Sequence, residues 1–410
     1  MALQSDRIIF HIDVNSAFLS WSALEQLEAG GGVDLRTIPS IVGGDMAKRH
    51  GVVLAKSIPA KAYGIVTGEP VVNAFRKCPN LVSVAPDHTM YSRRSRRLME
   101  YLSDICPDIE QVSIDECYMD YTPIASKYPS PEAAAAQIKD EIYENFKFTV
   151  NIGISDRKVL AKMASDFKKP NLVHTLYARE IREKMWPMPV SSLYMCGHSS
   201  AETLHKLGIL TIGDLARADL HILEAHLKSH GLTLWKYANG QDDSDVIPEP
   251  AKAKGIGNST TLSADAETRE DACSTLLRLA ESVGKRLRDS HQLAGLVCTE
   301  IKYNNFKSVS HQMPLEPPTA STDVLYRKAC QLFDQLWDGT PIRLLGLRTT
   351  KLVEENAPIQ LSLFDYMAPV SEKQQKLDAA LDSIRSRFGK DSIKRGSLLN
   401  SPSHLDKEDF

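Results

Sequence analysis

The stretch IIFHIDVNSAF, residues 8–18, decides how the chain begins to fold. Its alternating, β-branched first half predicts a strand over about 7–14. Asn15 follows as the expected N-cap of a helix that runs to about Leu27. Asp13 therefore stands at the end of an apolar strand, where its carboxylate would be presented at the edge of a sheet.

The segments downstream supply the other strands and helices of that sheet. IEQVSIDECYMDY (109–121) has the pattern of two strands joined at the acidic pair Asp115–Glu116. Ser130–Pro131 begins a helix in the favoured N-cap and N1 order, TVNIGIS (149–155) is a further strand, and DRKVLAKMASDFKK (156–169) is helical up to a proline stop. Strand, helix, two strands, helix and strand is the order of a ferredoxin-like sheet with helices packed on one face.

The rest of the chain divides into further segments, as its length of 410 residues leads us to expect. Residues 28–86 look inserted after the first helix, because the Gly30–Gly32 tract breaks the helix and short basic strands follow. Helical sequence dominates 186–250. Residues 254–352 are strand-rich with two helices and predict a separate α+β module, and 353–370 has the composition of a linker.

Composition places limits on the cellular setting. No run approaches the ~20 apolar residues that a membrane helix needs, and the start MALQSDRIIF lacks the layout of a secretory signal. We therefore expect a cytoplasmic protein with no membrane association. The seven cysteines are scattered without zinc-site spacing, which predicts reduced packing thiols; they are Cys78, Cys106, Cys117, Cys196, Cys273, Cys298 and Cys330.

Charge is distributed unevenly along the chain. The formal net charge of −3 taken alone argues weakly against nucleic acid, but residues 45–100 hold ten Lys and Arg against four acids. That local excess suits a surface that faces phosphates. For Arg93 to Arg97 a solvated helix face is an equally good interpretation.

Three carboxylates carry the chemistry that the sequence suggests. Asp13 ends one strand, and Asp115 and Glu116 lie where two others meet. Carboxylates gathered at one sheet edge suit a pair of Mg²⁺ ions, because hard cations prefer oxygen ligands and keep substrate phosphates in their shells. The alternative for each residue alone is an exposed acid at a strand end.

The residues that flank these carboxylates make their assignment more specific. HIDVNSAF and SIDECYMD resemble the two metal-binding motifs of the Y-family DNA polymerases, and the resemblance extends over nearly the whole chain. It implies that Asp13 and Asp115 bridge two Mg²⁺ ions, that Glu116 holds the ion nearer the primer terminus, and that the Val14 carbonyl completes the nucleotide-side ion.

The resemblance also implies a domain plan within an α+β fold class. A ferredoxin-like palm would take residues 1–27 and 87–185, with inserted fingers at 28–86. A helical, helix-hairpin-helix-like thumb would span 186–250, and an α+β little finger would span 254–352. Residues 353–410 would hold a linker, a clamp-binding peptide at 360–364 and a tail.

Three residues are expected to contact the incoming dNTP. Phe18 falls where the family carries a steric gate against the ribose 2′-hydroxyl, with Ala17 in place of a second aromatic. In the finger motif AKSIPAKAYGI, Ile58 and Lys61 stand where relatives have Tyr and Arg, so Lys61 keeps the charge but not the bidentate fork. Lys169 in LAKMASDFKKPN would reach the β- and γ-phosphates.

DNA and clamp contacts follow from the same resemblance. LGILTIGDLA resembles half of a helix-hairpin-helix, whose amides and helix ends bind DNA phosphates without reading bases. The segment IQLSLFDY matches the bacterial sliding-clamp peptide, with the alternative that it docks on its own chain; the clamp-binding residues are Gln360, Leu361, Ser362, Leu363 and Phe364. Farther on, Leu377, Leu381, Ile384 and Phe388 recur at helical spacing.

The resemblance therefore implies a monomeric translesion DNA polymerase that extends primer–template DNA with dNTPs by two-metal nucleotidyl transfer. Two other classes remain for comparison. A catalytically silent regulator would require a missing carboxylate, and none is missing. A nucleotidyl cyclase shares the sheet and the acids, although the clamp peptide and the DNA-binding modules speak against it.

Overall fold

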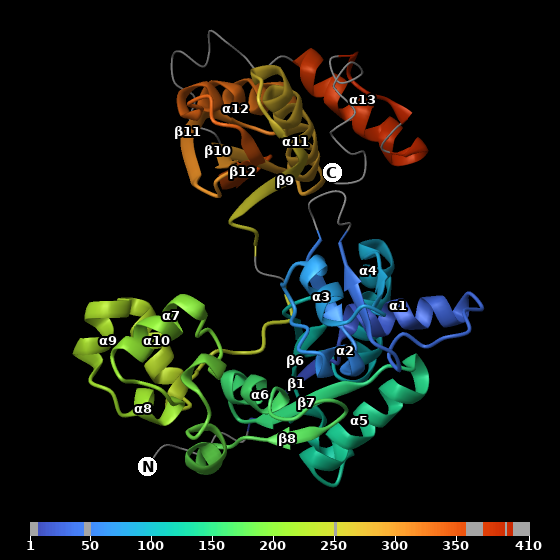
Figure 1. Ribbon diagram of the computed structural model, residues 1–410, viewed down its shortest axis with the longest axis vertical. Helices are drawn as coiled ribbons and strands as arrows, with labels where there is room; N and C mark the ends of the chain where they lie inside the picture. Colours follow the sequence, from blue (N-terminus) through green and yellow to red (C-terminus); the bar gives the residue numbers. More distant parts are fainter. Residues whose placement is uncertain (1–6, 45–50, 250–251, 358–371, 390–391, 397–410) are drawn as a thin grey trace. The chain divides into compact units, whose positions relative to one another are not determined.

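The computed structural model describes residues 7–44, 51–249, 252–357, 372–389 and 392–396. The chain forms two compact units, Met1–Gly44 with Val52–Pro250 and Asp45–Gly51 with Ala251–Phe410. The mixture of sheets and helices confirms the predicted α+β class (Figure 1).

A five-stranded sheet forms the centre of the first unit, in the order β5-β6-β1-β7-β8. Its strands are β1 (Ile9–Val14), β5 (Ile109–Gln111), β6 (Glu116–Asp120), β7 (Val150–Ser155) and β8 (Val173–Thr175). The first four have the antiparallel order of a ferredoxin-like sheet, as predicted. The edge strand β8, which runs parallel to β7, is an addition that the sequence pattern did not suggest.

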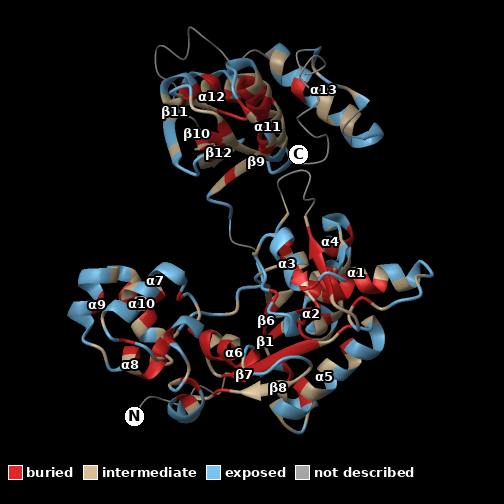
Figure 2. Ribbon diagram, viewed as in Figure 1, coloured by how far each residue is buried: buried red, intermediate tan, exposed pale blue. Residues whose placement is uncertain are grey.

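Alternation along β1 assigns its residues to the two faces of the sheet. Phe10 and Ile12 join a buried core with α1 (Ala17–Glu28), α4 (His88–Ile105) and α5 (Pro131–Phe146). The two helices of the ferredoxin-like unit therefore share one face, as predicted, while the following helix α6 (Lys158–Ser165) packs on the face of Ile9 and His11. A Cβ at Gly153 would lie 2.0 Å from the Ala161 carbonyl oxygen, so only glycine permits that approach. Figure 2 shows the resulting burial along β7.

Two predicted helix boundaries are wrong for the same reason. Helix α1 begins at Ala17 after Ser16, so Asn15 is not the N-cap. The Asn15 side chain instead accepts a hydrogen bond from the Asn171 amide at 2.9 Å and donates to Asn151 Oδ1 at 3.2 Å. Helix α6 ends at Ser165, and the buried Asn151 amide donates to the carbonyls of Ser165 and Lys168 beyond that end. Side-chain amides take over backbone groups that a longer helix would have paired.

Short elements make up the inserted segment 28–86, as predicted. A three-stranded sheet has the order β3-β2-β4, and two short helices flank it. Ser57 caps the first helix by accepting from the Ala60 amide at 3.0 Å. The elements are β2 (Ser40–Gly43), β3 (Val53–Lys56), α2 (Ile58–Ala62), α3 (Val71–Lys77) and β4 (Val82–Val84).

The helical segment that precedes residue 250 is confirmed. It contains α7 (His198–Lys206), α8 (Ile212–Ala216), α9 (Leu220–Leu227) and α10 (Ser229–Ala238), and its core is continuous with α6. Thr211 and Asp214 form a reciprocal capping box at the start of α8. Short helical turns connect the larger elements at Thr122–Lys127, Ala178–Glu180, Ile181–Met185 and Val190–Ser192.

The second unit confirms the predicted strand-rich module with two helices. Its antiparallel sheet has the order β11-β10-β12-β9, and two helices cover it to form one core. The elements are β9 (Gly255–Ala266), α11 (Arg269–Asp289), β10 (Gln292–Tyr303), β11 (Ser308–Thr319), α12 (Thr322–Leu336) and β12 (Ile342–Glu354).

A further helix, α13 (Glu372–Phe388), belongs to the second unit, which it contacts through the Arg288–Asp382 and Arg385–Glu281 ion pairs and through one buried acid, Asp378. Asp378 is 2% exposed, and its Oδ2 accepts from the backbone amide of Thr322 at 3.1 Å, the first residue of α12. Arg288 and Arg395 lie 3.7 and 3.2 Å from its two oxygens. An acid at a helix N-terminus with two arginine partners is a favourable buried arrangement.

Replacing Asp378 by alanine is therefore expected to destabilise the second unit by about 3 kcal/mol, because two arginines and a helix end lose a buried partner. The measurement is urea unfolding of the full chain, with hydrogen exchange at the first turn of α12 to locate the loss. Asp289→Ala is the control, since it removes only the Lys285 pair, whose Asp289 side chain is 58% exposed, and is expected to cost less than about 0.5 kcal/mol. Equal unfolding midpoints for the two variants would contradict a structural role for Asp378.

Two expectations from composition can be compared with the structure. Among the helices that the structure describes, none is long and apolar enough to cross a membrane. All seven cysteines lie in the described residues, and each is buried with a free thiol, which confirms that they are packing residues.

Candidate active site

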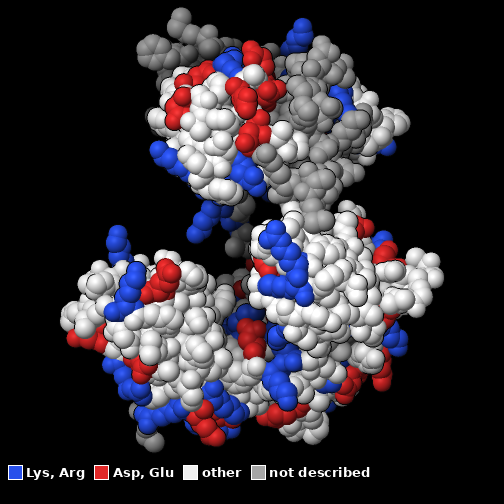
Figure 3. Space-filling model, in the orientation of Figure 1, with Lys and Arg blue, Asp and Glu red and all other residues white. Residues whose placement is uncertain are grey.

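Backbone pairing brings the three predicted carboxylates to one edge of the sheet. Asp13 on β1 stands directly opposite Glu116 on β6. The Val14 amide donates to the Asp115 carbonyl oxygen at 3.0 Å, which places the turn before β6 beside the end of β1. Figure 3 shows acidic side chains near β1 and β6, and Lys and Arg side chains over the inserted segment near α2 and α3.

Two lysines neutralise part of the carboxylate charge. Lys162 lies on α6, and Lys169 follows the end of that helix. Lys162 Nζ contacts Glu116 Oε2 and lies 3.6 Å from Asp13 Oδ2. Lys169 Nζ lies 2.8 Å from Asp13 Oδ1 and 2.9 Å from Asp166 Oδ1. Burial alone would lower the pKa of both ammonium groups, but the neighbouring carboxylates outweigh it and raise the pKa. Lys169 was a predicted site residue, whereas Lys162 was not.

Asp115 is hydrogen-bonded to a neighbouring hydroxyl group. Its Oδ1 accepts a hydrogen bond from the Ser113 hydroxyl at 2.6 Å. Burial raises the pKa of Asp115, the Ser113 bond opposes that shift, and the nearby charges of Asp13 and Glu116 add to it. Repulsion between close carboxylates is relieved when cations bind among them.

The donor chemistry of this edge fits divalent metal ions. Among the residues that the structure describes, no group of three Asp, Glu, His or Cys side chains converges closely enough to hold an ion as it stands. The reason is visible in the contacts, because Lys162 and Lys169 occupy oxygens of Asp13 and Glu116, and Ser113 occupies Asp115. Three carboxylates on adjoining backbone provide oxygen ligands of the kind that Mg²⁺ prefers once the lysines turn away.

Beneath Glu116 lies a buried histidine that was not predicted as a site residue. His11 is fully buried, its Nδ1 lies 2.8 Å from Ser165 Oγ, and its Nε2 lies 3.4 Å from Glu116 Oε2. Interaction with His11 and then with Lys162 holds the pKa of Glu116 at about 2, while burial lowers the pKa of His11. A neutral ring beside an ionised carboxylate favours the tautomer with its proton on Nε2. Sequence alternation could have indicated this role, since His11 shares a face with Asp13.

Phe18 lies at the start of α1, half-buried against aromatic side chains from α4. Its ring stacks on Tyr91 with centroids 4.5 Å apart and meets His88 edge-on at 5.9 Å. The Tyr91 hydroxyl lies 2.7 Å from Ser22 Oγ, and this hydrogen bond holds the Tyr91 ring in place. The neighbouring Ala17 is buried and presents no second ring.

The inserted segment presents lysines around helix α2. Ile58 is 63% exposed and has no polar side-chain atom to offer. Lys61 is exposed in the last turn of that helix. Burial lowers the pKa of Lys56, and the charge of Lys61 lowers it further. Two cations close enough to repel each other are stabilised by an anion between them.

Two arginines of the basic run on α4, Arg93 and Arg94, form ion pairs with helix α1. Arg93 Nη2 pairs with Glu25 at 2.9 Å, and Arg94 contacts both Glu25 and Glu28 of α1. The pKa of Glu25 is lowered by these arginines. For Arg93 and Arg94 the contacts therefore favour a structural role between two helices over a phosphate-facing one.

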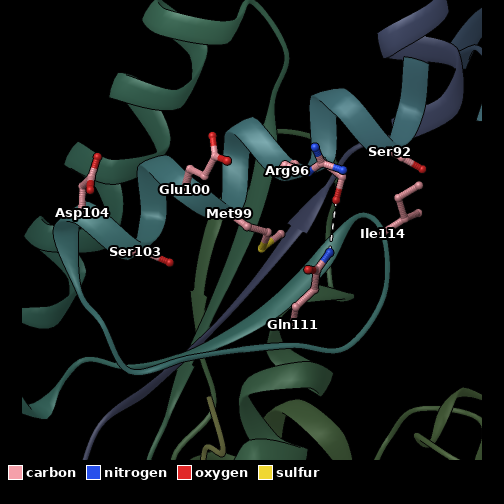
Figure 4. A pocket seen from close by; sticks show the side chains of 9 residues that line it. Ser92, Arg96, Met99, Glu100, Ser103, Asp104, Gln111 and Ile114 are labelled. Atoms are coloured by element: carbon pink, nitrogen blue, oxygen red, sulfur yellow. Dashed lines mark hydrogen bonds between the residues drawn. The ribbon is translucent and has the colours of Figure 1, made fainter. Parts of the chain in front are cut away.

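A hollow of about 580 Å³ lies nearby, between α4 and the turn before β6 (Figure 4). Its lining includes Arg96, Glu100 and Ile114, and Gln111 donates across it to Ser95 at 3.2 Å. None of the predicted site residues lines it. The site is thus defined by the carboxylate edge rather than by this hollow.

The predicted clamp-binding residues 360–364 lie outside the described residues.

Comparison with known proteins identifies the family. Residues 12–166 match the impB/mucB/samB family, and residues 253–363 match the C-terminal domain of the same family. DNA polymerase IV of Clostridium acetobutylicum is 44% identical over 96% of this chain and 98% of its own length. DNA polymerase IV of Acetivibrio thermocellus is 37% identical over 96% and 98%, and DNA polymerase IV 1 of Bacillus subtilis is 35% identical over 96% and 93%.

The fold agrees with those relatives. A solved Y-family DNA polymerase chimera superposes with a TM-score of 0.73 at 22% identity, covering 85% of this chain and 99% of the chimera. That likeness confirms the predicted architecture, and the relatives confirm the class of enzyme over the cyclase alternative. The chain belongs to the Y family of DNA-directed DNA polymerases, within its DNA polymerase IV group.

Proposed function

We propose that this chain is a translesion polymerase that adds dNTPs to a primer 3′ end at the edge formed by Asp13, Asp115 and Glu116. The observation that carries the proposal is the strand register that sets Asp13 opposite Glu116, with Asp115 beside Val14. Two Mg²⁺ ions would be held by these carboxylates and the Val14 carbonyl. When bound, such ions supply the charge that activates the attacking hydroxyl and stabilises the leaving oxygen.

The lysines of the site supply the remaining positive charge. Lys169 already contacts Asp13, and on nucleotide binding we propose that it turns to the β- and γ-phosphates. Lys61, with Lys56 beside it, would meet the triphosphate from the inserted fingers segment. Before the ions bind, Lys162 and His11 keep Glu116 ionised and oriented. Catalysis of phosphoryl transfer depends on this kind of positioning and charge stabilisation.

Tolerance of damaged template bases is part of the proposal. The described fingers consist of three strands of three or four residues and helices of five and seven residues. So small a segment leaves little protein to close over the nascent base pair, and a distorted template base meets few clashes. We place this activity in the cytoplasm and assign it to a monomer.

Primer extension by the purified chain with Mg²⁺ and dNTPs, on undamaged and abasic templates, tests the proposal directly. Template-directed extension on both is the expected result. Binding of DNA without extension on either template would instead favour the silent regulator.

Lys61 provides the first specific prediction. Lys61→Ala is expected to raise the KM for dNTP by at least roughly tenfold, because a charged contact to phosphate is worth about 1.5–3 kcal/mol. Steady-state insertion kinetics and a DNA-binding titration should be run together. Lys77→Ala is the matched control in the same segment, since its ammonium is already taken by Glu69 at 2.7 Å and the Gly64 carbonyl at 2.8 Å. Weakened DNA binding with an unchanged KM would place Lys61 on the template.

We also propose that the segment 360–364 tethers the polymerase to the sliding clamp. In sequence it lies between β12 and α13, both parts of the second unit. A short peptide with two or three apolar anchors binds at about micromolar Kd, or about −8 kcal/mol. Linkage to a chain already on DNA raises its effective concentration, so the two contacts reinforce each other.

Replacing Gln360, Leu363 and Phe364 together by alanine is therefore expected to abolish the increase in product length that a loaded clamp provides. Single-nucleotide insertion on a short free primer should stay unchanged and serves as the control. The measurement is extension on a long primed circle with and without loaded clamp. Undiminished stimulation of the triple variant would mean that the segment docks on its own chain instead.

A further inference from the structure

Two cysteines of the second unit face each other across its helices. Cys273 lies in the first turns of α11, and Cys330 lies in the middle of α12. The Cys330 thiol donates to Cys273 Sγ with the sulfur atoms 3.4 Å apart. The two side chains are 6% and 8% exposed. Since 57 residues separate them in sequence, this proximity is a product of the fold and not of local spacing.

An ion pair close to the two thiols also links helix α11 to helix α12. Arg269, four residues before Cys273, pairs with Asp334, four residues after Cys330, through two hydrogen bonds of 2.7 and 2.8 Å. The Cys330 hydrogen bond and then the Arg269 charge lower the pKa of Cys273, against the effect of burial. The same hydrogen bond and burial raise the pKa of Cys330. One sulfur is thereby prepared to lose its proton beside a second that retains it.

A surface hollow reaches one member of this pair, Cys330, while Cys273 is not among its lining residues. It has a volume of about 550 Å³ and is lined by Arg269, Tyr326, Cys330 and Asp334, among others. At four other cysteines burial raises the pKa and outweighs any neighbouring cation, which makes those thiols poor nucleophiles; they are Cys106, Cys117, Cys196 and Cys298.

We propose that Cys273 and Cys330 form a dithiol site that hydrogen peroxide converts to an intramolecular disulfide between α11 and α12. The Cys273 thiolate attacks a peroxide oxygen, the O–O bond breaks, and hydroxide leaves and is protonated to water. The product is a sulfenic acid at Cys273. Cys330 then loses its proton and attacks Cys273 Sγ, and the S–O bond breaks to release a second water. Two thiols are oxidised and one peroxide is reduced to two waters.

The disulfide would tie the two helices that cover the sheet of the second unit. Closing a loop of that length removes conformational freedom from the unfolded chain, so the oxidised unit is expected to unfold at a higher temperature. A dithiol reductant would reverse the change. The site therefore answers oxidising conditions by stiffening the second unit while leaving the carboxylate edge of the first unit chemically unaltered.

The experiment is oxidation of the full-length folded chain with hydrogen peroxide, followed by alkylation and trypsin digestion without reductant. Each thiol lies alone in its tryptic peptide, residues 270–278 and 329–343. The expected result is a cross-linked pair of these peptides, lighter by about 2 Da than their sum, which dithiothreitol separates. Cys298→Ser should form the same cross-link and is the control.

The single variants locate the two steps. In Cys330→Ser, peroxide should leave a sulfenic acid at Cys273 that dimedone traps, with no cross-link. Phenylarsine oxide, which bridges two adjacent thiols, should block both alkylation sites of the unaltered chain and needs no variant. The proposal is overturned if peroxide yields no 270–278 to 329–343 cross-link in the folded chain, or if the cross-link forms only after denaturation.

Discussion

Replacing Asp13 by asparagine is expected to slow nucleotide incorporation by at least about a hundredfold, because phosphoryl transfer depends on ligands that position charge at the reacting oxygens. The side chain keeps its size, and Asp13 is only 15% exposed at a sheet edge, so the fold and DNA binding should persist. Single-turnover insertion at saturating dNTP is the measurement. Asp115→Asn is expected to have a comparable effect.

Asp166 offers a matched control within the same charge cluster. Its carboxylate pairs with Lys169 at 2.9 Å and Lys162 at 3.7 Å, yet it is not one of the proposed metal ligands. Asp166→Asn should therefore change the rate by no more than a few fold, as expected for a half-exposed ion pair. Wild-type turnover in both Asp13→Asn and Asp115→Asn would refute the proposed site, and an equal loss in Asp166→Asn would assign the effect to general electrostatics.

Replacing Phe18 by alanine is expected to raise ribonucleotide incorporation relative to dNTP by at least about tenfold. A ring that fills the space of the 2′-hydroxyl discriminates by steric exclusion, so its removal is expected to relax that exclusion. The stacking on Tyr91 holds the ring in one position, and Ala17 supplies no substitute. The measurement is the ratio of kcat/KM for rNTP and dNTP on the same primer.

A purely structural role for Phe18 gives a different pattern. Loss of an aromatic stack would lower the unfolding temperature without changing sugar selection. Phe18→Leu separates the two roles, since leucine retains apolar packing but not the flat ring, and an intermediate ratio is expected. An unchanged ratio in Phe18→Ala, together with reduced stability, would return Phe18 to the core.

The sequence by itself determined the order of the first four strands of the central sheet in the first unit, and the strand-rich, two-helix make-up of the second unit. Apolar alternation over 8–14 and 149–155 and the Ser130–Pro131 start are local signals, and β1, β7 and α5 follow them closely. The placement of Asp13 and Glu116 also followed, because antiparallel pairing of the two strands brings the end of one beside the start of the other. Local periodicity is enough where the outcome depends on which face of an element is apolar.

Helix ends were less predictable than helices. The DRKVLAKMASDFKK segment has no breaker before Pro170, so its pattern favours a helix to residue 169. The buried Asn151 amide, from the neighbouring strand, takes the carbonyls that a longer helix would have used. The expected cap at Asn15 failed for the same reason, since its side chain is paired with Asn151 and Asn171. A local sequence pattern gives no sign of competing hydrogen-bond partners that come from distant segments.

Only the tertiary structure decided which groups meet. It brings Lys162 and His11 onto Glu116, directs Arg94 to α1 and away from a free surface, and inserts Asp378 at the start of α12. The 3.4 Å contact between the sulfur atoms of Cys273 and Cys330 is likewise decided by the tertiary structure. A sequence pattern reports how strongly each residue favours burial or charge, but a contact depends on the packing of elements far apart in the chain, and so its partner is known only once the sheets and helices are assembled.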